Sequence, residues 1–126
     1  MRCGENAVVE VERDSRLSGT RGGAVRFDLP ESITAMREGR KTQTRRRSSY
    51  WLQKKPGSRI TIVHQGQYLG HATIVGAWVE RLKDADYEAE GYPTWQHFWH
   101  AWWSMYPDAE DLDGVTAIEF KDVTWT

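Results

Sequence analysis

The segment from Gly39 to Arg46 has the residue types best suited to chemistry. It places an amine, two hydroxyl groups and three guanidinium groups directly after a predicted helix. A lysine near other cations has a lowered pKa and can act as a base at neutral pH. A threonine hydroxyl needs such a base before it can attack a carbonyl carbon. Lys41 and Thr44 are therefore a candidate pair of base and nucleophile.

A proton donor for a leaving amine has to come from elsewhere in the chain. The acidic stretch from Asp84 to Gly91 holds four carboxylates and lies shortly before a Trp-rich segment. Each of them is a possible general acid. The residue types alone do not choose among them.

Lys41 also belongs to a longer basic stretch. Residues 37–59 contain nine Lys and Arg and one acid, a local charge of +8 in a chain whose net charge is −1. Such a separation predicts one basic face, which would attract polyanions such as RNA. The other interpretation is a solvated surface loop whose charges keep the protein soluble.

The elements before the first strands follow from capping and turn signals. Pro30, Ile33 and Met36 predict a short helix that ends with Gly39 as its C′ residue. Residues 41–56 show no clean period and end in a Lys-Lys-Pro-Gly turn signal. A long basic loop is therefore expected between the helix and the next strand.

Two strands joined by a hairpin are predicted next. Residues 59–64 read as a β-strand, and Gln65-Gly66-Gln67 as the turn. Residues 68–82 are rich in β-branched and aromatic side chains, with Gly70 and Gly76 as places for a bulge or bend. This pattern favours a curved antiparallel sheet.

The second predicted helix begins at Pro93-Thr94 and ends at Pro107. Its apolar side chains at spacings of three and four are Trp95, Phe98, Trp99, Trp102 and Met105. We expect this stripe to pack in the core. Trp103 and Trp51 lie off the stripe and are candidates for stacking on a ligand or for a partner interface.

A closing strand and the overall architecture complete the sequence prediction. Residues 115–125 return to β character, with Ile118, Phe120 and Thr124 on one parity. The order of elements predicts an α+β domain at residues 24–126, built on a partly closed antiparallel β-barrel. Residues 1–23 are expected to form a weakly ordered N-terminal arm or an added edge strand.

Length and composition narrow the class of protein. A chain of 126 residues is enough for one compact domain, and its single cysteine, Cys3, allows neither an internal disulfide nor a thiolate zinc site. His97 and His100 lack a third ligand at a recognisable spacing, so we expect no metal and no cofactor. The sequence has no apolar run long enough to span a bilayer and no apolar segment of a secretory signal, which favours a cytoplasmic protein.

Taken together, these motifs resemble the ASCH domain, a relative of the PUA RNA-binding fold, from about Phe27 to Val123. The resemblance rests mainly on the pattern Gly-x-Lys-x-x-Thr-x-Arg, which is formed here by Gly39, Lys41, Thr44 and Arg46. Further support comes from Ile33, from Pro56-Gly57 before a strand, from Glu90 ahead of a helix that ends in Met105-Tyr106-Pro107, and from the closing strand at 115–120.

The resemblance implies a PUA-like partly closed barrel with short helices packed around its rim, and a cleft where the motif meets Glu90. The members most similar in size are small bacterial amidohydrolases that hydrolyse the amide of N4-acetylcytidine. Carried over, Lys41 is the base, Thr44 the nucleophile and Glu90 the proton donor. Arg46 would stabilise the oxyanion or a phosphate.

The alternative is a single-stranded RNA-binding protein, with or without ribonuclease activity, that uses the basic loop 40–59. This chain is more basic and aromatic after the motif than a pocket for one nucleoside requires. The candidate contacts to RNA or substrate are Arg40, Arg45, Arg46, Arg47, Tyr50, Trp51, Lys54 and Lys55. Lys41, Tyr50, Lys54 and Lys55 are the candidates for ribonuclease chemistry. A third interpretation is a protein-interaction domain that uses exposed Trp residues.

Overall fold

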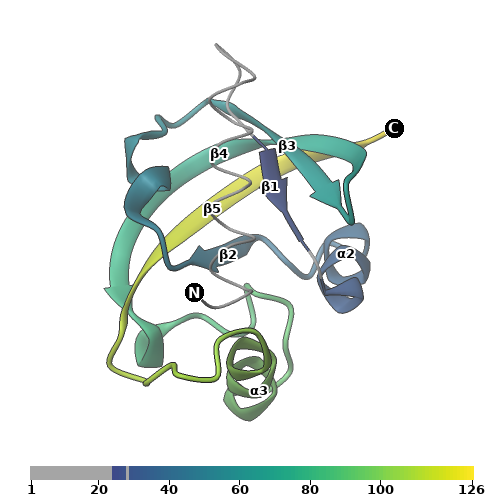
Figure 1. Cartoon of the computed structure of the whole chain (residues 1–126). Coiled ribbons are helices and arrows are strands. Elements are labelled where there is room, and N and C mark those ends of the chain that lie inside the picture. Colours follow the sequence, from purple (N-terminus) through teal and green to yellow (C-terminus); the bar gives the residue numbers. More distant parts are fainter. Residues whose placement is uncertain (1–23, 28) are drawn as a thin grey trace.

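A curled five-stranded sheet forms the frame of the protein (Figure 1). The computed structural model describes residues 24–27 and 29–126, so the predicted arm at 1–23 lies outside the described residues. The strands follow the order β1 (Ala24–Arg26), β3 (Arg59–His64), β4 (Gln67–Arg81), β5 (Gly114–Trp125) and β2 (Gln43–Arg46). Neighbouring strands are antiparallel, except that β1 pairs with β3 in parallel. The sheet curls into a half-barrel with two short helices at its rim, which confirms the predicted α+β, partly closed barrel.

The first helix, α2 (Pro30–Arg37), forms as the capping signals predict. Pro30 occupies the first turn, where its missing N–H has no intrahelical partner to lose. Gly39 has φ +78°, a conformation that favours glycine and ends the helix. The helix buries Ala35 and Met36 against the rest of the protein.

The hairpin between β3 and β4 also matches the prediction. Gln65 and Gly66 both have positive φ, as a two-residue turn of type I′ requires. The pairing of β4 shifts register beside Gly70 and Gly76, so both glycines lie at the bends expected of them. A Cβ on Gly70 would lie 2.1 Å from the carbonyl oxygen of Thr124, so β5 can cross here only because the residue is glycine.

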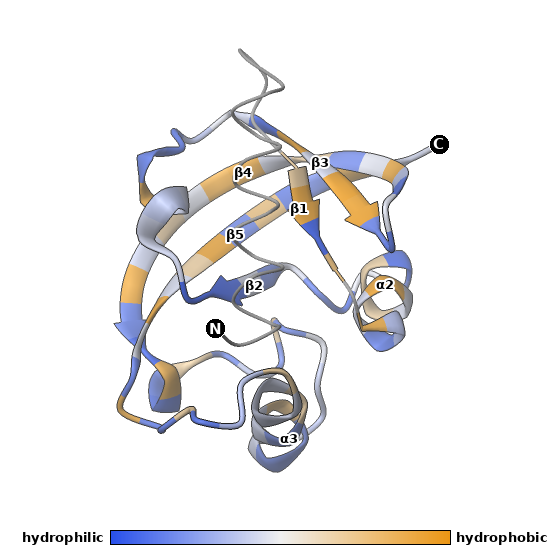
Figure 2. Cartoon of the chain, viewed as in Figure 1, coloured by the Kyte–Doolittle hydropathy of each residue, from blue (hydrophilic) through white to orange (hydrophobic). Residues whose placement is uncertain are grey.

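The predicted long loop at 41–56 is wrong, because it contains strand β2 and a 3-10 helix, η1 (Ser49–Gln53). β2 has the sequence Gln-Thr-Arg-Arg and no apolar alternation, and Figure 2 shows it as a hydrophilic strand. It forms because its backbone pairs with β5, and because the buried guanidinium of Arg45 pairs with Glu80 and Glu90 from distant parts of the chain.

Trp51 lies in η1 and is a second correction. Its side chain is 1% exposed and belongs to the main core cluster beneath the curled sheet. The ring of Tyr50 packs edge-on against it, with the ring centroids 5.2 Å apart. Because Trp51 is needed to fill the core, its ring does not stack on a ligand.

The second helix, α3 (Trp95–Met105), begins as predicted at Thr94, whose Oγ1 accepts a hydrogen bond from the His97 amide at 3.1 Å. Phe98 and Trp102 are buried in a second core cluster, which also contains Leu82 of the short 3-10 helix η2 (Leu82–Asp84). The other members of the predicted stripe, Trp95, Trp99 and Met105, pack against that cluster. Trp103 is 46% exposed and remains outside the core.

The end of β5 departs from the predicted parity. Ile118 and Phe120 are buried as expected, but Asp122 has φ +56° and the register shifts there. This bulge turns Thr124 outward and brings Val123 and Trp125 against the core instead.

Candidate active site

A cleft of about 420 Å³ opens between the two core clusters. One wall is polar and consists of Lys41, Thr44, Arg45, Arg46 and Glu90. The apolar and aromatic lining includes Phe27, Phe98, Trp102, Met105 and Tyr106. The structure therefore brings the three predicted catalytic residues, Lys41, Thr44 and Glu90, into one cleft.

Backbone hydrogen bonds hold the two halves of the polar wall together. The amides of Thr42 and Gln43 both donate to the carbonyl oxygen of Ala89, at 2.7 and 3.0 Å. The Ala89 amide donates in turn to Oδ1 of Asp86 at 3.0 Å. The amide of Phe120 on β5 donates to the Thr42 carbonyl at 3.0 Å. The positions of Lys41 and Glu90 are thus fixed by the main chain as well as by their side chains.

Gly91 allows the Glu90 segment to approach α2 closely. It has φ +96°, and a Cβ at this position would lie 2.7 Å from the Ala35 Cβ and 3.4 Å from the Lys41 Cβ. Arg40 reaches over to the same residue and donates from Nη1 to the Gly91 carbonyl at 2.8 Å. A side chain at Gly91 would therefore push the segment away from Lys41.

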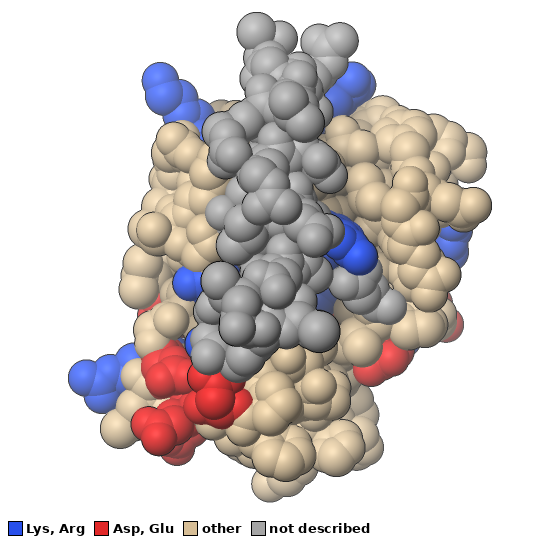
Figure 3. Space-filling model, in the orientation of Figure 1, with Lys and Arg blue, Asp and Glu red and all other residues tan. Residues whose placement is uncertain are grey.

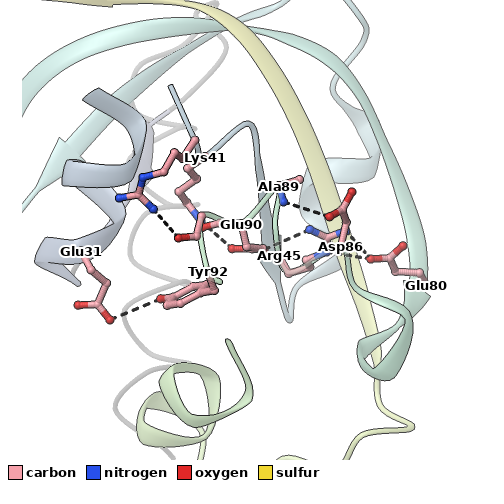
Figure 4. A network of polar contacts seen from close by, with 10 residues as sticks. Glu31, Lys41, Arg45, Glu80, Asp86, Ala89, Glu90 and Tyr92 are labelled. Carbon is pink, nitrogen blue, oxygen red and sulfur yellow. Dashed lines mark hydrogen bonds and ion pairs between the residues drawn. The ribbon is translucent and has the colours of Figure 1, made fainter. Parts of the chain in front are cut away.

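Lys41 and Glu90 form a buried ion pair, drawn in Figure 4. Nζ of Lys41 lies 2.6 Å from Oε1 of Glu90 and also donates to the Glu90 carbonyl at 3.2 Å. The two side chains are only 2% and 6% exposed. Burial lowers the pKa of Lys41 below its ordinary value; Glu90 opposes this shift, and Arg46 and Arg45 add to it.

This pair can exist in two forms with the same net charge. In one form the proton is on Lys41, giving an ammonium and a carboxylate. In the other it is on Glu90, giving a neutral amine and a carboxylic acid. Burial makes the first, charged form less favourable than it would be in water. The second form supplies a base and a general acid at the same time.

Glu90 has a second cationic neighbour in Arg45. Nη1 of Arg45 lies 3.4 Å from Oε2 of Glu90, and the other side of the guanidinium contacts Glu80 of β4 through Nε at 2.8 Å and Nη2 at 2.7 Å. Nε1 of Trp78 donates to the other oxygen of Glu80 at 2.9 Å. Figure 4 shows this chain of contacts running from Lys41 to Glu80.

Phe27 and Tyr92 supply aromatic surface close to the charged wall. The Phe27 ring lies 5.8 Å from Nζ of Lys41 and 5.1 Å from the guanidinium carbon of Arg46, which are cation–π distances. The hydroxyl of Tyr92 donates to Oε2 of Glu31 at 3.5 Å. Burial, with Glu31 and Glu90 nearby, raises the pKa of Tyr92, so it is a neutral phenol at neutral pH.

The remaining predicted contact residues lie outside this cleft. Arg40 pairs with Glu38 at 2.6 Å, Arg47 with Asp108 at 3.5 Å, and Nζ of Lys54 lies 5.3 Å from the centroid of the Tyr50 ring. Lys55 is exposed, and Trp51 is in the core as described above. Of the predicted contact residues, the structure brings Arg45 and Arg46 into the cleft.

Fewer cations lie on the surface than the predicted basic face requires, because Lys41, Arg45 and Arg46 are each at most 8% exposed. On the face shown in Figure 3, the Lys and Arg side chains that can be seen lie at separate places.

Sequence reasoning missed three residues that shape the site: Glu80, Tyr92 and Phe27. Glu80 carries a usable signal, because it is an acid near the end of a long strand of β-branched and aromatic residues. Such an acid calls for a cation beside it. Phe27 and Tyr92 carry no such signal, because an aromatic residue in a core and one in a cleft look alike in sequence.

None of the described helices is long and apolar enough to cross a membrane. No group of three or more His, Cys, Asp or Glu in the part of the chain that the structure describes is arranged to hold a metal ion.

No family model and no curated protein matches this chain. Several solved structures share its fold. ASCH from Zymomonas mobilis superposes with a TM-score of 0.59 at 18% identity, over 81% of this chain and 68% of that one. The ASCH domain from Lactobacillus crispatus JV V101 gives 0.60 at 14% identity, over 100% and 97% of the two chains. A protein from Enterococcus faecalis V583, assigned to DUF984, gives 0.59 at 15% identity, over 97% and 88%. The chain therefore has the fold of the ASCH domains, as its sequence resemblance predicts.

Proposed function

We propose that this protein is an amidohydrolase that removes the acetyl group of N4-acetylcytidine, with Lys41, Thr44 and Glu90 as its catalytic residues. The observation that carries the proposal is the buried Lys41–Glu90 pair, 2.6 Å apart, in a cleft that Thr44 also lines. The resemblance of the motif to small bacterial amidohydrolases supports the same assignment.

In the first half of the reaction, the neutral amine of Lys41 accepts the proton of the Thr44 hydroxyl. Oγ1 of Thr44 then attacks the acetyl carbonyl carbon and forms a tetrahedral intermediate. Glu90, as the carboxylic acid, gives its proton to N4 as the C–N bond breaks, and cytidine leaves. Thr44 now carries the acetyl group as an ester, Lys41 is an ammonium and Glu90 a carboxylate.

In the second half, water releases acetate. The Glu90 carboxylate takes a proton from water, and the resulting hydroxide attacks the ester carbonyl. The C–O bond to Thr44 breaks, and the Lys41 ammonium returns a proton to the threonine oxygen. Lys41 and Glu90 are then in their starting forms. Arg46 lines the same cleft and would stabilise the negative charge on the carbonyl oxygen in both intermediates.

The size and lining of the cleft support a small, uncharged substrate. Its volume of about 420 Å³ lies in the range of small-molecule sites. Phe27, Trp102 and Tyr106 give aromatic surface for a base, and Lys41 and Arg45 are paired with Glu90 inside the protein. A phosphate backbone would need cations that are open to solvent along a groove.

The test is to incubate the protein with N4-acetylcytidine and to follow cytidine by chromatography. Lys41→Ala, Thr44→Val and Glu90→Gln should each lower turnover by about a hundredfold or more, because each removes a proton-transfer or nucleophilic group. The matched control is Glu88→Gln, two residues from Glu90 but exposed, which should keep full turnover. Circular dichroism should show that all four variants are folded. Turnover that survives in the three site variants would contradict the proposal.

The same preparations test the alternative of an RNA-binding protein or ribonuclease. Arg40 and Lys55 in the loop 40–59 are exposed and give RNA a place to bind outside the cleft. Intact nucleoside together with Lys41-dependent shortening of a labelled single-stranded RNA would indicate a ribonuclease. RNA binding that weakens steeply with salt and survives Lys41→Ala would indicate a binding module without chemistry.

A further inference from the structure

Glu80 lies outside the predicted triad, yet it is connected to it through a single residue. Its side chain is 18% exposed, and its Oε2 contacts both Nε and Nη2 of Arg45. Its other oxygen accepts the hydrogen bond from Trp78. The contact of Arg45 with Glu80 is shorter than that with Glu90, at 2.7 Å against 3.4 Å.

We propose that Glu80 is a positioning residue that neutralises Arg45 and holds it against Oε2 of Glu90, so that Glu90 can still carry a proton on Oε1. This inference rests on the proposed function, because it concerns the general acid of that reaction. It assigns a role to a carboxylate that neither the motif nor the comparisons point to.

The physical reason is the balance of charge around Glu90. A buried guanidinium without a counterion would hold a neighbouring carboxyl group in its charged form and lower its pKa. Glu90 would then fail to protonate the leaving amine at neutral pH. Glu80 offsets that charge, so the stronger contact of Glu90 is the one with Lys41, at 2.6 Å.

The charged and titratable groups around the pair give the sign of the effect. They include Arg45 and Arg46 of β2, Glu80 of β4 and Arg26 of β1, which lines the same cleft. Tyr92 is neutral, and its hydroxyl contacts Glu31. Removing the negative charge of Glu80 makes the surroundings more positive, which lowers the pKa of Lys41 further and favours the carboxylate form of Glu90.

The experiment compares the pH dependence of kcat/KM for N4-acetylcytidine in the wild type and in charge variants. Glu80→Gln should move both limbs of the bell-shaped profile about one pH unit lower and reduce kcat at neutral pH about tenfold, with KM little changed. Glu88→Gln removes the same formal charge from an exposed position and should leave the profile in place.

Two further variants show whether Glu80 acts through Arg45. Arg45→Gln alone should move the profile to higher pH, because it removes a positive charge. The double variant Arg45→Gln/Glu80→Gln removes one positive and one negative charge, so it leaves the net charge around Glu90 unchanged and should bring the profile back close to that of the wild type. The double variant also keeps the test valid if Glu80→Gln alone fails to fold.

A readout without substrate separates this inference from the proposed function. The carboxyl carbon of Glu90 and the ε carbon of Lys41 can be titrated by ¹³C NMR in the free protein. Both midpoints should fall in Glu80→Gln and recover in the double variant. If the wild type leaves N4-acetylcytidine intact, the proposed function fails while this titration still decides the role of Glu80. Unchanged midpoints in folded Glu80→Gln, or a double variant displaced as far as the single one, would overturn the inference.

Discussion

Replacing Gly91 by alanine tests how the site is packed. The backbone at Gly91 has φ +96°, which disfavours any residue with a Cβ. The new methyl group would also lie 2.7 Å from the Ala35 Cβ and 3.4 Å from the Lys41 Cβ. Real Cβ atoms do not approach each other to 2.7 Å, so α2 or the Glu90 segment must move.

The chain contains a matched control for the backbone part of this effect. Gly57 has φ +91°, but a Cβ there would meet no atom within 4 Å. Gly57→Ala should therefore cost only the backbone strain, about 1–2 kcal/mol. Gly91→Ala carries the same strain and adds the cost of overpacking, about 1–3 kcal/mol, for a total of about 2–5 kcal/mol.

Equilibrium unfolding in urea measures both variants, with the free energy of unfolding obtained from the midpoint and the slope. We expect Gly91→Ala to be less stable than Gly57→Ala by at least about 1 kcal/mol and to lose turnover, because Lys41 and Glu90 are pushed apart. Gly57→Ala should keep its turnover. Equal stabilities of the two variants would refute the close approach of Gly91 to α2 and Lys41.

Two other predictions follow from burial. Trp51→Ala should lower the free energy of unfolding by about 3–5 kcal/mol, because Trp51 is 1% exposed. Trp103 is 46% exposed, so Trp103→Ala should change it by about 0.5 kcal/mol or less. Thermal unfolding compares the two variants, and a larger loss in Trp103→Ala would contradict the placement of Trp51 in the core. Burial holds the pKa of Lys41 in the folded protein below its ordinary value of 10.5, which applies to the unfolded chain. At a pH between these two pKa values the unfolded chain binds more protons than the folded one, so stability rises with pH. Urea midpoints measured from pH 7 to pH 10 should therefore rise more in the wild type than in Lys41→Met, and parallel curves would count against the lowered pKa.

The sequence was sufficient for the elements whose signals are local. Gly39 ends α2 because it supplies a positive φ, and Thr94 begins α3 because its hydroxyl caps the first turn. The turn at Gln65-Gly66 needs only two residues of the right conformation. None of these depends on contacts with distant parts of the chain.

The predictions failed where distant contacts decide the structure. β2 was expected to be part of a loop because four polar residues show no strand pattern, and its burial depends on Glu80 and Glu90, far along the chain. Trp51 was expected to contact a ligand or a partner because it lies off the predicted apolar stripe, whereas the 3-10 helix turns its ring into the core. The place of Thr124 depends on a bulge at Asp122 that no turn signal announced.

For the candidate site, the residue types indicated Lys41 and Thr44, and the resemblance chose Glu90 from the four acids of residues 84–91. The structure places all three at one cleft, while their catalytic roles stay predictions. The partners of the pair could not be predicted, because a sequence shows which charges exist and not which of them are desolvated together.

The separation of Lys41 and Glu90 along the chain also sets when the site can form during folding. The two residues are 49 positions apart, and closing a flexible loop of that length costs about 3 kcal/mol in chain entropy. The β3–β4 hairpin lies between them and can form from local contacts, without closing that long loop. The β3–β4 hairpin is therefore expected to form first, and the Glu90 segment to dock afterwards. The cleft between them is in this sense a late product of folding, and it would also be among the first parts to open when the protein unfolds.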